Sequence, residues 1–168
     1  MSQPTVAILM GSKSDLPKLQ SGINILKEFG IPHTVRVMSA HRTPAVVMDF
    51  TTNAKANGYQ VIIAAAGVAA HLAGVVAAHT PLPVIGIPVN GGPLNGIDAL
   101  LATVQMPGGI PVATTAIGSM GAKNASLLAI RILALKDADV AAKLDAYTEE
   151  MAAIVIAADE ELQAELQG

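Results

Sequence analysis

The sequence alternates between short β-branched runs and helical stretches, and this alternation restricts its fold more than any other feature. Each apolar run ends in a loop of small polar residues that leads into a stretch with helical periodicity. Strands that are apolar without alternation are typical of a parallel sheet with helices on both faces. The pattern predicts one three-layer α/β domain of about five parallel strands. The predicted strands are Thr5–Leu9, Thr34–Met38, Gln60–Ala64, Val84–Ile87 and Val112–Ile117.

Residues typical of helix ends support the same division of the chain. Gly30 and Gly58 follow two predicted helices at the position where a left-handed residue often ends a helix. Thr43 precedes Pro44, which is the usual order of an N-cap residue and a proline in the first turn. The predicted helices are Leu16–Phe29, Pro44–Asn57, Ala70–His79, Ile97–Val104 and Ala122–Leu135.

The composition changes after Asp137, where a further helix is predicted. Apolar side chains recur at spacings of three and four from Val140 to Leu162 and give this helix one apolar face. Periodicity alone leaves open whether that face packs on its own domain or on a neighbouring subunit. We expect a single domain over residues 1–168, with an α/β core at 1–136 and the helix at 137–168.

The chain carries few charges for its size. Charged residues make up 14% and hydrophobic residues 52%, so we expect part of its apolar surface to be buried against other copies of the chain. With a net charge of −3, we expect no nucleic-acid partner. Cysteine is absent and the first residues do not resemble a signal peptide, and both observations favour a cytoplasmic protein.

One apolar stretch raises the alternative of a membrane protein. Val61–Ala78 contains a single polar side chain, His71, and it approaches the length of about 20 residues that spans a bilayer. Gly67 and Gly74 interrupt it, however, and its β-branched residues gather mainly at its start. A buried strand, a turn and a buried helix explain the stretch better, so we expect no membrane partner.

Three loops follow strands and are therefore candidate sites, because ligands of open parallel sheets bind at the carboxyl ends of the strands. The first loop runs from Gly11 to Asp15, and its small residues allow backbone N–H groups to face a phosphate. Asp15 would repel a phosphate and suits ribose hydroxyls better. From the sequence alone, the simpler interpretation of Asp15 is an N-cap, and that of Lys13 is a surface charge.

The second loop, Ser39–Pro44, places a titratable group beside a permanent cation. A free imidazole titrates at about pH 6.5, so His41 suits proton transfer. Arg42 suits bidentate binding of a phosphate. The alternatives are a surface histidine and an arginine paired with a carboxylate, and the loop alone favours them.

The third loop, Ala66–Leu72, consists of small residues that lead into a helix. Such a loop can form a dry niche lined by backbone N–H groups, suited to a carboxylate or carbon dioxide. His71 alone would more commonly be a structural residue that holds the loop. The four histidines lack the spacing of a metal site and no cofactor motif is present, so we expect neither a metal nor a cofactor.

Taken together, these loops resemble one enzyme family. The motifs MGSKSD, SAHRTP, AAHL and VQMPGGIPVATTAIG followed by NASLLA are similar to those of the 5-(carboxyamino)imidazole ribonucleotide mutases, the bacterial type of aminoimidazole ribonucleotide carboxylase. The resemblance extends from about Val6 to Leu135. It implies a flavodoxin-like, doubly wound fold with an extra C-terminal helix. It also implies a homo-octamer whose active sites lie between subunits, with the C-terminal helix reaching across neighbours.

The resemblance also implies an activity and a set of site residues. The activity is an isomerisation in purine biosynthesis, in which a carboxylate leaves a ribonucleotide as carbon dioxide and is recaptured without metal, biotin or ATP. His41 corresponds to the catalytic histidine. The implied substrate-binding residues are Ser12, Asp15 and Arg42, with Ser14 and Ser39 as further candidates, and Gly67, Ala70, His71 and Leu72 around the migrating carboxylate.

The chain departs from the family pattern at two places. Val68 and Ala73 stand where the family commonly has GGAAHLPG, and Asn90–Leu94 differs from a loop that commonly contains serine. Two other functions stay open. Direct carboxylation by free carbon dioxide is one, although those relatives usually lack the AAHL motif. A non-catalytic ribonucleotide-binding module, which would not require His41, is the other.

Overall fold

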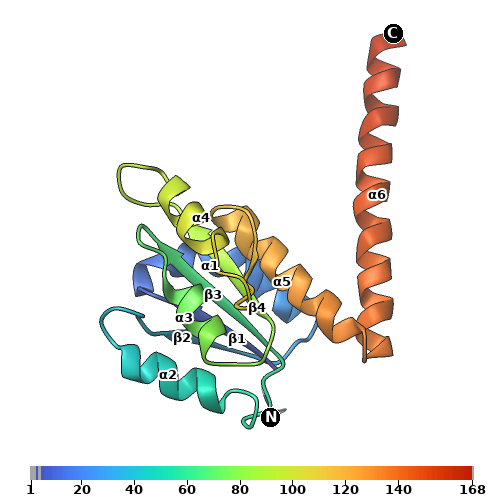
Figure 1. The fold of residues 1–168 in the computed structure, drawn as a ribbon. Coiled ribbons are helices and arrows are strands. Elements are labelled where there is room, and N and C mark those ends of the chain that lie inside the picture. Colours follow the sequence, from blue (N-terminus) through green and yellow to red (C-terminus); the bar gives the residue numbers. More distant parts are fainter. Residues whose placement is uncertain (1–2, 4, 168) are drawn as a thin grey trace. The chain divides into compact units, whose positions relative to one another are not determined.

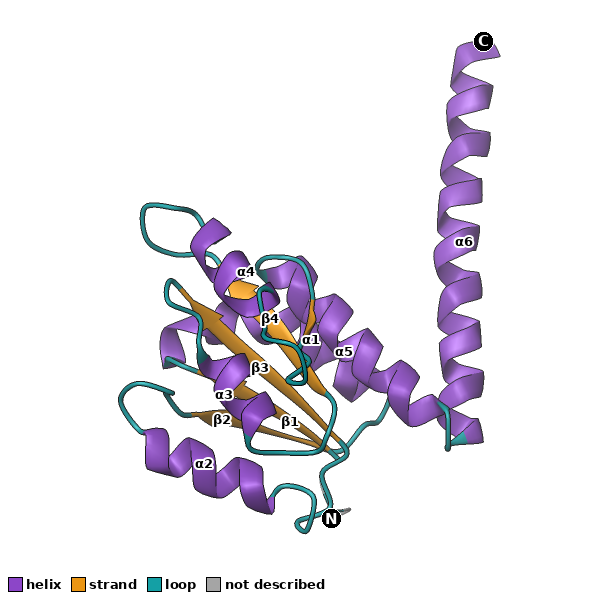
Figure 2. Cartoon of the chain, viewed as in Figure 1, coloured by secondary structure: helices purple, strands orange, loops and turns teal. Residues whose placement is uncertain are grey.

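In the part of the chain that a computed structural model describes, residue 3 and residues 5–167, five parallel strands form one sheet in the order β2-β1-β3-β4-β5. The strand β1 pairs with both β2 and β3, so the loops after these three strands leave the sheet at the same end (Figure 2). The strands are β1 (Val6–Met10), β2 (His33–Val37), β3 (Val61–Gly67), β4 (Val84–Val89) and β5 (Ala113–Thr114).

Helices cover both faces of this sheet. Helices α2, α3 and α4 lie on one face, and α1 with the part of α5 up to Ala129 lies on the other (Figure 1). The helices are α1 (Leu16–Glu28), α2 (Pro44–Asn53), α3 (Leu72–Ala78), α4 (Ile97–Val104), α5 (Ser119–Ala134) and α6 (Ala138–Gln167), and a short 3-10 helix, η1 (Lys13–Asp15), precedes α1. The predicted doubly wound, flavodoxin-like α/β fold is confirmed.

The strands are buried as a parallel sheet requires. Every residue of β1 and β4 is buried, whereas the edge strand β2 is only partly covered. Between the sheet and helices α2 and α3, Leu9, Ile62 and Val76 belong to one apolar cluster with Val47 and Leu72. Full burial of such a side chain contributes about 1.5–3 kcal/mol, so this cluster fixes the position of the helices that carry the loops.

Several element boundaries differ from the sequence prediction, and the structure shows the reason for two of them. Helix α3 begins at Leu72 rather than Ala70, because the His71 N–H is bonded to the Ala69 carbonyl at 2.9 Å in a turn. The last strand covers only Ala113–Thr114. After it, the N–H groups of Thr115 and Gly118 bond to β4 carbonyls outside the regular ladder.

The apolar stretch that raised the membrane alternative is divided as predicted. It forms β3 up to Gly67, a turn, and α3 from Leu72. Among the described residues, no helix is both long enough and apolar enough to cross a bilayer. Gly30 and Gly58 have φ values of 71° and 85°, so the left-handed conformation predicted for both is confirmed.

Helix α1, which begins directly after the first candidate loop, lies very close to α5. A Cβ atom at Gly22 would fall 2.4 Å from the carbonyl oxygen of Ala122 and 2.7 Å from Oγ of Ser126. Nearby, the Ser21 hydroxyl donates to the Ser119 carbonyl at 2.7 Å. Only glycine permits this approach, so the position of α1 on the sheet is closely fixed.

The chain divides into two compact units, Met1–Ala129 and Ile130–Gly168. The second unit contains α6, which confirms the predicted C-terminal helix. Asp137 caps its start, since Oδ1 accepts from the N–H groups of Asp139 and Val140, each at 3.1 Å. Apolar side chains on α6 such as Ile154 and Val155 are exposed. The partner of its apolar face stays a prediction.

Candidate active site

A cavity of about 500 Å³ lies at the carboxyl ends of β1, β2, β3 and β4. All three candidate loops reach it, as the position of ligand sites in open parallel sheets predicts. Ala70 is the one candidate outside its wall; this residue is buried and 1% exposed. The candidates that line the cavity are Ser12, Ser14, Asp15, Ser39, His41, Arg42, Gly67, His71 and Leu72.

The first loop presents a pair of hydroxyls and a carboxylate. Oγ of Ser12 accepts from the Ser14 N–H at 3.3 Å, and the two serine hydroxyls are 2.8 Å apart. Asp15 has helical dihedral angles and its side chain makes no capping hydrogen bond. Asp15 therefore occupies the predicted N-cap position of α1, but its side chain does not cap the helix, and its carboxylate is available to a ligand.

Burial changes the pKa of the Asp15 carboxylate. Partial removal from water raises the pKa of Asp15, because burial disfavours the charged form. The charge of Lys18, and to a smaller extent a backbone hydrogen bond from Ser12, act in the opposite direction. The net effect is a raised pKa for Asp15, so this carboxylate is held in the cavity wall at a cost in stability.

The second loop is a tight turn built around Ser39. Its Oγ accepts from the backbone N–H groups of His41 at 3.3 Å and of Arg42 at 3.2 Å. Oγ1 of Thr43 accepts from the Ser39 N–H at 2.9 Å and lies 3.2 Å from the Ser39 carbonyl. Thr43 occupies the N-cap position of α2 but makes no side-chain cap, so its hydroxyl serves the turn instead. The turn directs His41 and Arg42 to the cavity.

Arg42 joins the first two loops. Its Nη2 donates to the Gly11 carbonyl at 2.8 Å. Arg42 and Ser12 also line a smaller adjoining hollow of about 290 Å³, which Lys13 borders. The guanidinium therefore stands at the junction of the two hollows with further N–H donors, which suits an anion such as phosphate.

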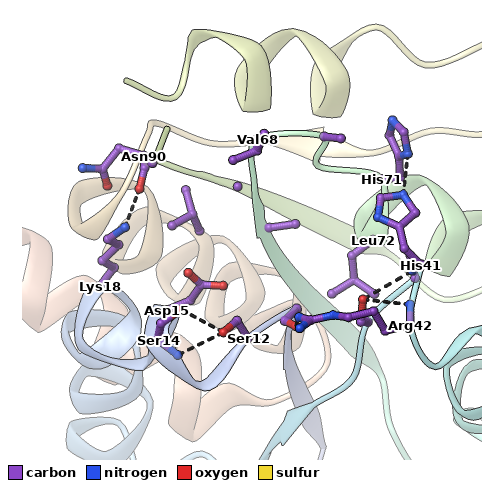
Figure 3. A pocket seen from close by; sticks show the side chains of 18 residues that line it. Ser12, Ser14, Asp15, Lys18, His41, Arg42, Val68, His71, Leu72 and Asn90 are labelled. Atoms are coloured by element: carbon purple, nitrogen blue, oxygen red, sulfur yellow. Dashed lines mark hydrogen bonds between the residues drawn. The ribbon is translucent and has the colours of Figure 1, made fainter. Parts of the chain in front are cut away.

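Two histidines from different loops contact each other at one end of the cavity (Figure 3). Nε2 of His41 lies 2.8 Å from Nδ1 of His71, and the rings meet edge to face with centroids 4.8 Å apart. One of these nitrogens must carry the hydrogen and the other must accept it. If both rings were fully protonated, two N–H groups would face each other. The geometry therefore fits a hydrogen bond in which one ring donates and the other accepts.

The third loop differs from the predicted niche in one respect. Because the His71 N–H already bonds to the Ala69 carbonyl, that donor is not free for a ligand. Val68 has a φ of 56°, a left-handed conformation that is rare for a β-branched residue. A glycine at this position would adopt it without strain.

The cavity wall also contains residues that the sequence did not single out, among them Lys18, Asn90 and Gly91. Nζ of Lys18 donates to the Asn90 carbonyl, which links α1 to the end of β4. Two sequence signals point to them. Lys18 follows Asp15 by three residues, a spacing that places both on one side of a helix, and Asn90 directly follows a buried strand.

Comparison with known proteins identifies the family to which the chain belongs. The family model described as AIR carboxylase matches residues 5–154. The chain belongs to the AIR carboxylase family. Among relatives of this family member, the N5-carboxyaminoimidazole ribonucleotide mutase of Saccharolobus solfataricus is 54% identical over 148 residues, covering 88% of this chain and 92% of the relative. The mutase of the same name from Bacillus subtilis is 50% identical over 160 residues, 95% of this chain and 99% of the relative.

A solved structure supports the same assignment. The crystal structure of Treponema denticola PurE superposes with a TM-score of 0.85 at 33% identity, covering 95% of this chain and 98% of that chain. The resemblance drawn from the loop motifs is therefore confirmed for the family and for the fold. The chain is a member of an enzyme family, and its candidate loops form one cavity.

Proposed function

We propose that this protein is an isomerase of purine biosynthesis that converts 5-carboxyamino-1-(5-phospho-D-ribosyl)imidazole to 5-amino-1-(5-phospho-D-ribosyl)imidazole-4-carboxylate. The observation that carries the proposal is the contact between His41 and His71 in the same cavity as Asp15 and Arg42. That cavity combines a proton carrier with groups for ribose and phosphate. The names of the mutases at about 50% identity support the same reaction.

The ribonucleotide is bound by complementary charge and hydrogen bonding. The Asp15 carboxylate, which lacks a capping role, accepts from ribose hydroxyls. The Arg42 guanidinium and the hydroxyls of Ser12, Ser14 and Ser39 bind the phosphate, to which charged hydrogen bonds each contribute about 1.5–3 kcal/mol. This arrangement directs the imidazole base toward His41.

His41 carries one proton through two steps. Its imidazolium protonates the exocyclic nitrogen as the bond from that nitrogen to the carboxyl carbon breaks. Carbon dioxide leaves, and the bonding electrons stay on the nitrogen. C4 of the imidazole then forms a bond to carbon dioxide, and His41 removes the C4 proton to restore aromaticity and its own positive charge. Protons and charge balance, and no cofactor takes part.

His71 orients His41, and the loop that contains His71 bounds the space for the migrating carboxylate. The His71 ring, 2.8 Å from Nε2 of His41, orients the catalytic ring. The loop from Gly67 to Leu72, Ala70 included, bounds the space for carbon dioxide beside C4. Holding both fragments together replaces a bimolecular encounter, an effect of up to about 7–11 kcal/mol in favourable geometries.

We further propose a cytoplasmic homo-octamer as the working form. Helix α4 exposes Ile97, Leu101 and Val104, which are 54%, 52% and 46% exposed and share one side of the helix at spacings of four and three. Helix α6 separately exposes apolar side chains such as Ile154 and Val155. An exposed apolar surface of this kind suits contacts between subunits. The absence of cysteine suits a reducing compartment.

Turnover of the carboxyamino substrate without ATP or added bicarbonate tests the reaction. Substrate labelled at the carboxyl carbon should give product that retains most of the label, even in excess unlabelled bicarbonate, because recapture at C4 outruns escape. Complete exchange of the label, with efficient use of free aminoimidazole ribonucleotide and bicarbonate, would instead identify a direct carboxylase. Binding of the ribonucleotide without any turnover would identify a binding module.

A further inference from the structure

We propose that Lys18 is a positioning residue for ribonucleotide binding, which acts through Asp15 at the ribose end of the cavity. The inference rests on the proposed function and adds to it a residue to which neither the loop motifs nor the comparisons assign a role. Lys18 does not touch the reacting atoms: Figure 3 shows it with Asn90 at the end of the pocket away from His41 and His71.

The position of Lys18 follows from helix geometry. Asp15 is the last residue of η1 and Lys18 lies in the first turn of α1, three residues later, so both side chains face the same side. Both line the cavity, and both are partly buried. Nζ of Lys18 donates to the main-chain carbonyl of Asn90, which holds the ammonium group in the same cavity wall as the carboxylate.

The acceptor of this hydrogen bond belongs to a glycine-rich connection. Residues 90–96 join β4 to α4, and Gly92, Asn95 and Gly96 in this connection have φ values of 65°, 51° and 93°. Such a segment loses more conformational entropy on ordering than most sequences. The hydrogen bond from Lys18 links Asn90, the first residue of this connection, to α1. One side chain therefore orders both the connection and the cavity wall that contains Asp15.

The charge of Lys18 has a second consequence for Asp15. Burial raises the pKa of Asp15, and Lys18 is the main influence that lowers it. The other titratable or charged groups on the cavity wall are Arg42, His41 and His71, and Arg42 is bonded to the Gly11 carbonyl. Lys18 therefore favours the ionised form of Asp15, which accepts hydrogen bonds from two ribose hydroxyls.

Calorimetry with the product, 5-amino-1-(5-phospho-D-ribosyl)imidazole-4-carboxylate, tests this role together with steady-state kinetics. In Lys18→Met, we expect the product affinity to fall about tenfold, as for a lost charged interaction, with KM raised and kcat little changed. Lys18→Arg should restore most of the affinity. The matched control is Lys27→Met, which removes an exposed charge from the last turn of the same helix and should leave affinity unchanged.

A double-mutant cycle separates positioning from a general structural effect. If Lys18 acts through Asp15, the Lys18→Met change should cost little affinity once Asp15→Asn is present. In the single variant, the acid limb of kcat/KM should move to higher pH, because loss of the cation raises the pKa of Asp15. Lys18→Gln, which keeps a hydrogen-bond donor without the charge, should show the same displacement of the acid limb.

Two results would overturn the inference. One is a Lys18→Met protein with the affinity of the wild type. The other is a loss of affinity from Lys18→Met that is equal with and without the Asp15→Asn change, since Lys18 would then act independently of the carboxylate. Wild-type protein that fails to bind the product would contradict the proposed function itself, and that outcome is distinct because it appears before any substitution is made.

Discussion

Val68 offers a direct test of the strained third loop. Its φ of 56° places a β-branched side chain in the left-handed region, while its side chain is 51% exposed. Replacement by glycine should relieve the strain. Val37 in β2 is a matched control because it is 52% exposed and is not among the residues with positive φ.

The expected magnitude follows from the difference between the two sites. Both Val→Gly changes lose a half-exposed side chain, about 1 kcal/mol by surface area, and both increase the entropy of the unfolded chain by about 0.5–1 kcal/mol. Only Val68→Gly removes a left-handed conformation that costs about 1–2 kcal/mol for a residue with a Cβ. We therefore expect Val68→Gly to be nearly neutral, and Val37→Gly to be destabilising by about 1.5–2 kcal/mol.

Urea unfolding measures both free energies. Each variant is compared with the wild type at one fixed protein concentration, because self-association contributes to apparent stability. Val68→Ala supplies an intermediate, since it removes the β-branch and keeps the Cβ. Equal destabilisation by Val68→Gly and Val37→Gly would refute the argument, because it would mean that the backbone at Val68 stores no strain.

Four other predictions concern the site and the assembly. His41→Asn should abolish turnover while product affinity stays within a few fold, and near-wild-type rates at saturating substrate would remove His41 from the mechanism. Asp15→Ala and Arg42→Ala should each weaken product binding by about 1.5–3 kcal/mol, roughly ten- to hundredfold; calorimetry that finds no change in either would overturn their assignment. Because burial raises the pKa of Asp15, binding should weaken on acidification at a higher pH than for an ordinary aspartate, and a pH-independent affinity would contradict this expectation. The native state also holds this proton more tightly than the unfolded state, so Asp15→Asn should be more stable than wild type at neutral pH. Light scattering should find an octamer, and a stable monomer at micromolar concentration would disprove it.

The fold was largely predictable because its signals are local. Buried strands, small-residue loops and helix ends follow one another along the sequence, and the rule that ligands bind at the carboxyl ends of parallel strands locates the cavity. The last strand was predicted too long, since the N–H of Thr115 bonds to Gly86 and that of Gly118 bonds to Pro88 outside the ladder. Hydrophobic character alone does not indicate where the regular hydrogen bonding between two strands ends.

The parts of the site that escaped prediction depend on contacts across space. His41 and His71 are thirty residues apart in sequence, and only the adjacency of their two loops brings the rings to 2.8 Å. Lys18 was not singled out in the sequence, because its acceptor, the Asn90 carbonyl, lies 72 residues further along the chain. The sequence alone favoured capping for Asp15, and only the absence of a side-chain cap in the structure points to ligand binding instead.

The close approach of α1 to α5 at Gly22 has a consequence for how the site tolerates change. Gly22 lies four residues from Lys18, about 6 Å along the helix axis, and any side chain there would collide with the Ala122 carbonyl. To relieve that collision, the helix would have to shift, and Asp15 and Lys18 would move with it. In a library of random variants screened for ribonucleotide affinity, Gly22 should therefore behave like a binding-site position, although it does not line the cavity.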